Sequence, residues 1–208
     1  GLVASIKKDG GMASAVEMDV ADGDSVNAAV SEADQELGGI SILLNNSGVA
    51  GTQAAIDIDE AEWDRVVDTN LKGAWLVGRA VAKRMIARDR GGSIINTGSV
   101  LAFKVQKGTM PYGVSKAGLV QMTRMLAVEW ARYGIRVNAI APGYIETDIN
   151  RKFLQSGAGQ AMVKAIPQRR FGEPEDLEGV VLLLAGDASS YITGALIPVD
   201  GGHTLMLA

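Results

Sequence analysis

Short apolar runs alternate along this chain with longer amphipathic stretches, and this alternation restricts the fold more than any other feature. Runs typical of β-strands cover residues 13–18, 40–45, 93–96, 135–140 and 196–199. Patterns typical of helices lie between them, over residues 24–37, 60–88, 111–132 and 175–184. Strands and helices that alternate in this way form a parallel sheet covered by helices. The sequence therefore predicts an α/β fold with a doubly wound parallel sheet.

The length and composition suit a single folded domain that spans residues 1–208. Hydrophobic residues make up 47% of the chain and charged residues 21%, which is typical of a globular protein with a sizeable core. No repeat, low-complexity tract or linker interrupts the pattern. The near-continuous apolar run at 40–45 predicts a strand that is covered on both faces of the sheet.

Composition also excludes several classes of function. The net charge of -4 argues against nucleic acid as the main partner. The chain has no cysteine and a single histidine, His203, so we expect neither disulfides nor a metal site. The longest apolar run, at 180–185, falls well short of the roughly 20 residues that a membrane span needs. We therefore expect a cytoplasmic protein that binds neither membranes nor nucleic acid.

Tyr112 and Lys116 form the strongest local signal for chemistry. They lie four residues apart in a predicted helix and so share one face. A free tyrosine, with a pKa of about 10, is a poor base near neutral pH. A nearby ammonium group favours the phenolate and lowers that pKa, so that the tyrosine can exchange a proton with a substrate oxygen. Taken alone, the pattern is equally consistent with an ordinary amphipathic helix.

Polar and turn-forming residues follow three of the predicted strands, where open α/β sheets bind their ligands. Ser99 follows the run at 93–96, the segment 45–48 (NNSG) follows the run at 40–45, and Pro142-Gly143 follows the run at 135–140. Each is by itself most often a simple turn. Asn70, next to Gly73 in the pattern at 60–88, predicts a local irregularity in that helix. Together these signals converge on one edge of the sheet.

In these features the sequence resembles the classical short-chain dehydrogenase/reductase family over essentially all of its length. The matching elements, in order, are Asp19-Val20, the segment 45–48, Asn70, Ser99, Tyr112 with Lys116, Pro142-Gly143, Thr147 and the segment 200–202 (DGG). The resemblance implies a Rossmann-like sheet and an oxidoreductase that uses NAD or NADP. Its substrate would be a small carbonyl compound or secondary alcohol.

The resemblance also implies a role for each matching residue. Tyr112 would be the general acid or base, Lys116 would lower its pKa and bind the nicotinamide ribose, and Ser99 would orient the substrate oxygen. Asn70 would hold a water molecule in a proton relay to Lys116. The cofactor would be contacted by Asp19, Val20, Asn45, Gly48, Tyr112, Lys116, Pro142, Gly143, Ile145 and Thr147.

Two departures from the family pattern stand out. Ser47 replaces an alanine, a small change that we expect to be tolerated. The Gly-rich turn that cradles the pyrophosphate is missing upstream of Asp19. We therefore expect an N-terminally incomplete sheet without the family's first two strands and first helix. The segment 13–18 would then lose its neighbours, and the strand at 40–45 would present a long apolar edge.

Three functions are compatible with different parts of this evidence. The first is the NAD(P)-dependent oxidoreductase, and the alternative is a truncated, non-catalytic relative that cannot bind the dinucleotide. A serine hydrolase is disfavoured because no Gly-x-Ser-x-Gly turn surrounds Ser99. The residues expected to face substrate, or simply to close the fold, are Leu101, Phe103, Val105, Tyr144, Ile149, Phe153 and Met162.

The two long helical patterns carry more apolar positions than one sheet face needs. Examples are Trp63, Val66, Val67, Trp75, Met122, Met125, Leu126 and Trp130. The family uses these helices to dimerise, often within a tetramer. We therefore expect a homo-oligomer, either a dimer or a homotetramer.

Overall fold

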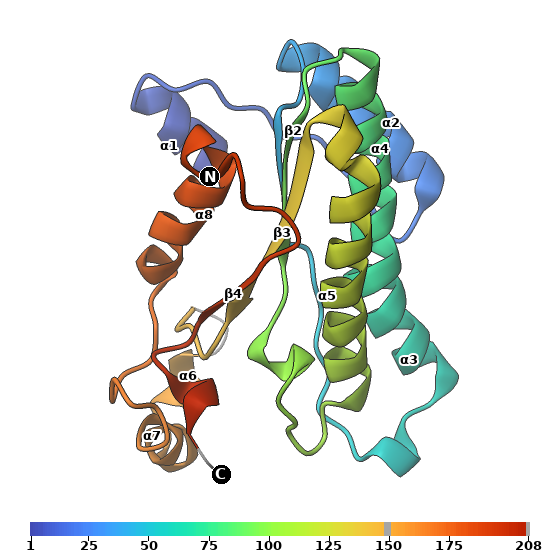
Figure 1. Cartoon of the computed structure of the whole chain (residues 1–208). Helices are drawn as coiled ribbons and strands as arrows, with labels where there is room; N and C mark the ends of the chain where they lie inside the picture. Colours follow the sequence, from blue (N-terminus) through green and yellow to red (C-terminus); the bar gives the residue numbers. More distant parts are fainter. Residues whose placement is uncertain (148–150, 207–208) are drawn as a thin grey trace.

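A parallel sheet forms the centre of the molecule in a computed structural model that describes residues 1–147 and 151–206. The strand order among these residues is β1-β2-β3-β4, and each neighbouring pair is parallel. The strands are β1 (Ile42–Asn45), β2 (Gly92–Thr97), β3 (Ile135–Pro142) and β4 (Leu196–Val199). Their carboxyl ends all point to one edge of the sheet (Figure 1).

Helices cover both faces of this sheet, as Figure 1 shows. One face carries α2 (Gly23–Glu36), α3 (Glu60–Val67), α4 (Ala74–Ala87) and α5 (Met110–Trp130), and the other carries α1 (Leu2–Lys8) and α8 (Glu178–Ala185). Two short helices, α6 (Arg151–Leu154) and α7 (Gly157–Val163), lie beyond the carboxyl ends of the strands. None of the described helices has the length and apolar character needed to cross a membrane. The doubly wound α/β prediction is confirmed.

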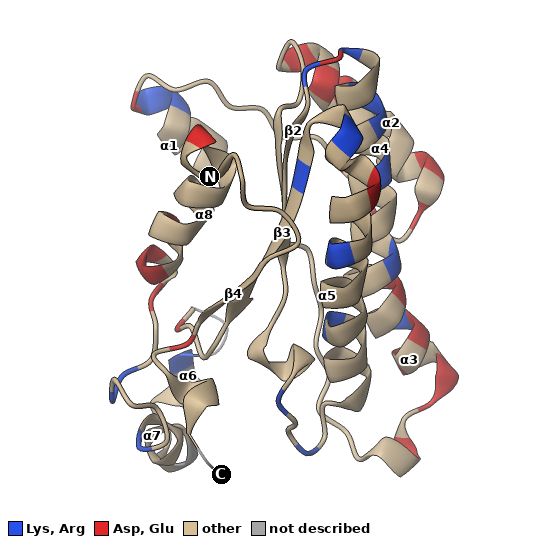
Figure 2. Ribbon diagram, viewed as in Figure 1, with Lys and Arg blue, Asp and Glu red and all other residues tan. Residues whose placement is uncertain are grey.

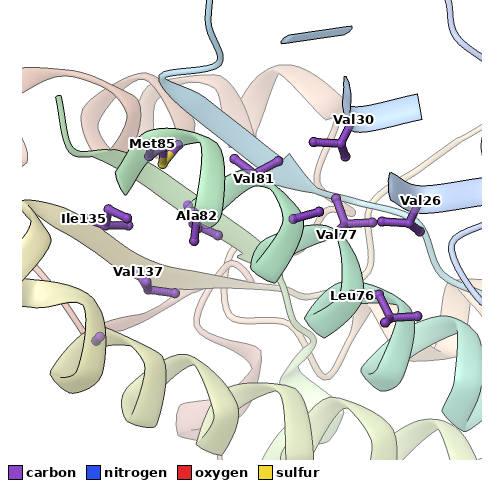
Figure 3. Close-up of a cluster of buried hydrophobic side chains, with 12 residues drawn as sticks. Val26, Val30, Leu76, Val77, Val81, Ala82, Met85, Ile135 and Val137 are labelled. Carbon is purple, nitrogen blue, oxygen red and sulfur yellow. The ribbon is translucent and has the colours of Figure 1, made fainter. Parts of the chain in front are cut away.

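The larger core lies between the sheet and the helices α2, α4 and α5. Figure 3 shows Val26 of α2, Val77 of α4 and Val137 of β3 within this cluster, and each is at most 4% exposed. A smaller cluster of Ile95, Ile140 and Leu184 packs β2 and β3 against α8. Full burial of each such side chain contributes about 1.5–3 kcal/mol. The two clusters pack β2 and β3 between the two layers of helices.

The sequence-based prediction of a strand at 13–18 is wrong. This segment runs ahead of α2 without joining the sheet. A strand needs a hydrogen-bonded neighbour, and no described strand lies beside β1 on that side. The prediction that the strand at 40–45 is covered on both faces is also wrong. With no described strand on that side of β1, Ile42 and Leu44 are 49% and 44% exposed. The exposed apolar edge expected from the sequence is present.

The helical pattern predicted at 60–88 is interrupted where the sequence indicated an irregularity. A π-helical segment, Asp68–Gly73, separates α3 from α4 and contains the buried Asn70. Gly73 approaches Val20 so closely that a Cβ atom there would lie 2.9 Å from Val20 Cγ2 and 3.1 Å from the Asp68 carbonyl oxygen. Glycine is therefore required for the close packing of this turn.

Replacement of Gly73 by alanine should destabilise the protein by about 1–3 kcal/mol, because the added methyl group meets backbone atoms that cannot move away. Gly179→Ala in α8 is the matched control, since a Cβ there would meet nothing within 4 Å. The control should be neutral or stabilise the protein by up to about 1 kcal/mol. Urea unfolding followed by circular dichroism measures both. Equal unfolding free energies for the two variants would contradict the packing argument.

Candidate active site

A cavity of about 490 Å³ opens at the carboxyl ends of β2 and β3. It gathers segments that are far apart in the chain: the loop after β1, the loop after β2, the start of α5 and the loop after β3. The predicted site residues that line it are Gly48, Ser99, Tyr112, Lys116, Pro142, Gly143, Ile145 and Thr147. The structure thus brings the predicted proton-transfer residues and part of the predicted cofactor set together.

Tyr112 and Ser99 form one side of the cavity. Pro111 stands in the first turn of α5, where a missing backbone N–H costs nothing, and Tyr112 follows it. Ser99 is 7% exposed, and its Oγ accepts a hydrogen bond of 3.1 Å from the Leu101 backbone N–H. Burial raises the pKa of Tyr112, and a hydrogen bond with Ser99 opposes that rise only in part. Tyr112 therefore keeps its proton near neutral pH.

Lys116 lies one helical turn beyond Tyr112 and is 4% exposed. Its Nζ donates a hydrogen bond of 2.7 Å to the Thr97 carbonyl oxygen and lies 5.7 Å from the centre of the Tyr112 ring. Burial lowers the pKa of Lys116 to about 8. The sequence led us to expect that Lys116 lowers the Tyr112 pKa, whereas loss of solvent raises it in this structure. Burial penalises both charged forms and dominates here.

Asn70 fastens the loop after β1 to α5. Its side-chain nitrogen donates to the Val49 carbonyl oxygen at 2.9 Å and to Ser115 Oγ at 3.1 Å, and its Oδ1 accepts from the Val49 N–H at 2.8 Å. A Cβ atom on Gly48 would lie 3.2 Å from Asn70 Oδ1 and 3.5 Å from Lys116 Nζ. These hydrogen bonds of Asn70 thus hold Gly48 beside Lys116.

Three of the predicted cofactor contacts lie outside this cavity. Asn45 donates from its side chain to the Ala74 carbonyl oxygen at 3.1 Å and to Asn96 Oδ1 at 3.0 Å, which ties β1 to α4 and β2. Asp19 and Val20 lie just before α2, where Asp19 Oδ1 accepts from the Ala21 N–H at 2.9 Å. No Gly-rich turn between a strand and a helix lies among the described residues ahead of α2.

Most of the residues expected to face substrate lie elsewhere. Tyr144 lines the cavity, whereas Leu101, Phe103, Val105 and Met162 do not. Phe103 and Val105 are 46% and 100% exposed. Ile149 and the side chain of Phe153 lie outside the described residues.

Sequence reasoning missed several residues of the site. Ser115 is buried and accepts the Asn70 hydrogen bond, and its place in the motif one turn from Tyr112 was a usable signal. Thr97 supplies the carbonyl group that holds Lys116, and it directly follows the strand predicted at 93–96. Pro174 and Leu177 line the far wall, and nothing in the sequence pattern singles them out.

The cavity fits the nicotinamide half of a dinucleotide. Thr97 Oγ1 is buried beside it without a hydrogen-bond partner among the described residues. A Cβ atom on Gly48 would crowd Asn70 Oδ1 and approach Lys116 Nζ, so glycine keeps the space beside Lys116 clear. Lys116 Nζ and the hydroxyl groups of Ser99 and Thr147 add polar groups on the same wall. Donors, an open glycine and a concave apolar lining are what a cofactor site provides.

Comparison with known protein families gives a match over nearly the whole chain. A sequence profile described as enoyl-(acyl carrier protein) reductase matches residues 1–204. The chain is 41% identical over 185 residues to the 3-oxoacyl-[acyl-carrier-protein] reductase FabG of Thermotoga maritima. That match covers 89% of this chain and 74% of the relative.

Solved structures of dehydrogenases also match this chain. A short-chain type dehydrogenase/reductase from Mycobacterium marinum superposes with a TM-score of 0.92 at 37% identity. A gluconate 5-dehydrogenase from Burkholderia cenocepacia, determined in complex with NADP and tartrate, superposes with a TM-score of 0.94 at 34% identity. Each comparison covers 99% of this chain and 81% of the other chain.

The buried ammonium group makes stability depend on pH. The pKa of Lys116 is about 8 in the folded chain against an ordinary 10.5, so between these values the unfolded chain binds the extra proton. The unfolding free energy of the wild type should therefore rise with pH across this window by about 1–3 kcal/mol relative to Lys116→Met. Chemical unfolding at pH values that span the window measures the difference.

Lys83→Met is the control for this experiment, because Lys83 is exposed and its removal takes no buried charge from the protein. The difference between wild type and this variant should stay flat across the same window. If Lys116→Met and Lys83→Met follow the same pH curve, Lys116 carries no desolvation penalty and the argument fails.

Proposed function

The chain belongs to the short-chain dehydrogenase/reductase family, and we propose that it transfers a hydride between NAD or NADP and a carbonyl or secondary-alcohol substrate. The observation that carries this proposal is the meeting of Ser99, Tyr112 and Lys116 on one wall of a single cavity. The family's cofactor is a nicotinamide dinucleotide. When bound, it supplies the hydride in reduction and accepts it in oxidation.

In this proposal Ser99 and Tyr112 act on the substrate oxygen. The Ser99 hydroxyl group donates a hydrogen bond to the oxygen, where negative charge develops as the carbonyl is reduced. Tyr112, which the raised pKa keeps protonated, donates its proton to that oxygen. In oxidation the same phenol group receives the proton of the alcohol. Ser99 is buried and Tyr112 is partly buried, which strengthens these interactions.

Lys116 and Asn70 support the reacting groups. The Lys116 ammonium group, which donates to the Thr97 carbonyl oxygen, is proposed to bind the nicotinamide ribose and to stabilise charge on Tyr112. The side chain of Asn70 is engaged by Val49 and Ser115. We therefore propose that the main role of Asn70 is to position the loop at 48–50. Its π-helical backbone is the proposed place for a relay water.

The proposed cofactor site falls into two parts. Gly48, Pro142, Gly143, Ile145 and Thr147, together with Tyr112 and Lys116, surround the nicotinamide half. Asp19, Val20 and Asn45 are proposed to lie toward the adenosine half. The distinction between NAD and NADP is not assigned to any of these residues.

The rival hypothesis is a relative that keeps these residues but does not bind the dinucleotide. Titration of the chain with NADH and with NADPH in a calorimeter separates the two. Saturable heat with either nucleotide supports the oxidoreductase, and no heat with both supports the rival.

We also propose a homo-oligomer, a dimer or a homotetramer, built on α4 and α5. Val128 and Met125 of α5 are 81% and 55% exposed, and Trp75 of α4 is also exposed. Figure 2 shows charged residues at a few positions along α5, separated by uncharged turns. Exposed apolar side chains that gather in one patch mark protein interfaces, and we propose that these side chains form such a patch. The cytoplasmic location stays a prediction.

Replacement of Tyr112 by phenylalanine removes the proton donor and leaves the ring in place. Turnover should fall by about 100-fold or more, the range attributed to a positioned acid or base. Calorimetric titration should show cofactor affinity within about threefold of wild type, since a positioned proton donor acts on the reacting oxygen. Tyr191→Phe, on a fully exposed tyrosine, is the control. Turnover near the wild-type value in Tyr112→Phe would exclude Tyr112 as the acid.

A charge placed on the exposed α5 face should weaken the assembly. Val128→Glu should shift the protein toward the monomer in size-exclusion chromatography with light scattering, because the interface would bury an unpaired carboxylate. Ile56→Glu, at an equally exposed apolar position outside α4 and α5, should leave the oligomer intact. A wild type that elutes only as a monomer would refute the assembly proposal.

A further inference from the structure

Ser115 of α5 is in contact with the π-helical segment that carries Asn70, and α5 runs alongside that segment and α4 (Figure 1). The side chain is 0% exposed and has no part in the proposed proton transfer. Its Oγ donates a hydrogen bond of 2.7 Å to the Tyr112 carbonyl oxygen and accepts one of 3.1 Å from Asn70 Nδ2. Ser115 therefore connects the helix of the reacting residues directly to the Asn70 side chain.

The Ser115 hydroxyl group can only accept a hydrogen bond from Asn70. A hydroxyl group has one proton and a carbonyl oxygen can only accept, so the Ser115 proton is engaged by the Tyr112 carbonyl oxygen. The Ser115 oxygen then offers only lone pairs to Asn70, and the Asn70 amide has to present its nitrogen there. The Asn70 amide oxygen is thereby turned away from Ser115.

The orientation of the Asn70 amide decides whether it can hold Val49. Asn70 Oδ1 accepts from the Val49 N–H at 2.8 Å, and Asn70 Nδ2 donates to the Val49 carbonyl oxygen at 2.9 Å. A flipped amide would place oxygen against oxygen and N–H against N–H, so both bonds would be lost. One Nδ2 proton is used by Val49 and the other by Ser115, in a residue that is 1% exposed. A single orientation therefore satisfies every partner of this buried amide.

Close packing of α5 against the π-helical segment accompanies the bond between Ser115 and Asn70. Gly118 follows Ser115 by three residues, and a Cβ atom there would lie 2.8 Å from Leu71 Cδ2. Glycine is unfavourable in the interior of a helix, and here its missing side chain leaves room for Leu71. Because Leu71 is the neighbour of Asn70 in the sequence, this contact brings the Asn70 amide within reach of Ser115.

We propose that Ser115 is a positioning residue that fixes the orientation of the Asn70 amide and thereby holds the loop at 48–50 in place for the cofactor. Val49 follows Gly48, which lines the active-site cavity and whose Cβ position lies 3.5 Å from Lys116 Nζ. Without the Ser115 hydroxyl group, one buried Nδ2 proton loses its partner, and the amide holds Val49 less firmly. The inference rests on the proposed function for the cofactor, and on the hydrogen bonds alone for the loop.

Ser115→Ala removes the hydroxyl group and keeps the rest of the side chain. The Val49 amide proton should then exchange with deuterium about tenfold faster, as loss of one hydrogen bond from Asn70 predicts, and the Asn70 side-chain amide signals should shift. NMR measures both on the chain without cofactor. Ser115→Cys, which keeps a weaker acceptor, should give an intermediate rate. Ser93→Ala is the matched control, because Ser93 is 2% exposed and donates at 2.7 Å to the Leu184 carbonyl oxygen at the other end of β2.

The control should leave the Val49 exchange rate and the Asn70 signals at their wild-type values. In an Asn70→Ala background, Ser115→Ala should change Val49 exchange no further, because Ser115 acts through the Asn70 amide. An unchanged Val49 exchange rate in Ser115→Ala would overturn the proposal. So would a further increase in the double variant, since Ser115 would then act on the loop by another route.

The cofactor part of the inference has its own measurement. Calorimetric titration of Ser115→Ala with NADH and NADPH should give a Kd about tenfold above wild type, while kcat stays within about threefold. An equal Kd for the two proteins would overturn this part. If the wild type binds neither nucleotide, the proposed function fails, and Val49 exchange still decides whether Ser115 positions the loop.

Discussion

The parallel pairing of β2 with β3 is the interaction on which the rest of this molecule depends. The two strands stay in register from Gly92 opposite Ile135 to Thr97 opposite Ile140. Both are clamped between helical layers, and the pairing continues past the strand, since the Gly98 N–H donates to the Ile140 carbonyl oxygen at 2.8 Å. As a result, the loop that carries Ser99 and the loop that carries Tyr144 leave the sheet side by side. The two walls of the candidate active-site cavity that these loops form are therefore placed by this pair.

Much of the fold could be predicted from the sequence because hydrophobic periodicity is a local property. The strands at 92–97, 135–142 and 196–199 and the long helix of Tyr112 lie where their patterns indicated. The segment at 13–18 failed because a strand is defined by its partner and not by its own residues. The helical spacing of Tyr112 and Lys116 and the strand-end position of Ser99 were equally readable. The hydrogen bond from the Tyr144 hydroxyl group to Gln106 Oε1 was not, because it depends on the conformations of two loops.

Burial of Lys116 shows how electrostatics shapes the site. Its ammonium group has one strong partner, the Thr97 carbonyl oxygen, and little water, so the pKa falls to about 8. Loss of water acts on Tyr112 in the opposite direction and raises the pKa of the phenol. The pair therefore meets a substrate with a neutral tyrosine and a weakly held lysine proton. Such a pair donates a proton to a substrate more readily than it accepts one.

The π-helical segment between α3 and α4 has a consequence for how this chain tolerates change. A π turn holds more residues than an α turn, and one extra residue rotates everything beyond it by about 100° about the helix axis. Asn70 can then face Val49 and Ser115 while Leu76 and Val77 face the core. The segment therefore changes which side of the helix faces the core. Loss of a single residue from 68–73 would turn a whole helix, whereas a substitution there stays local.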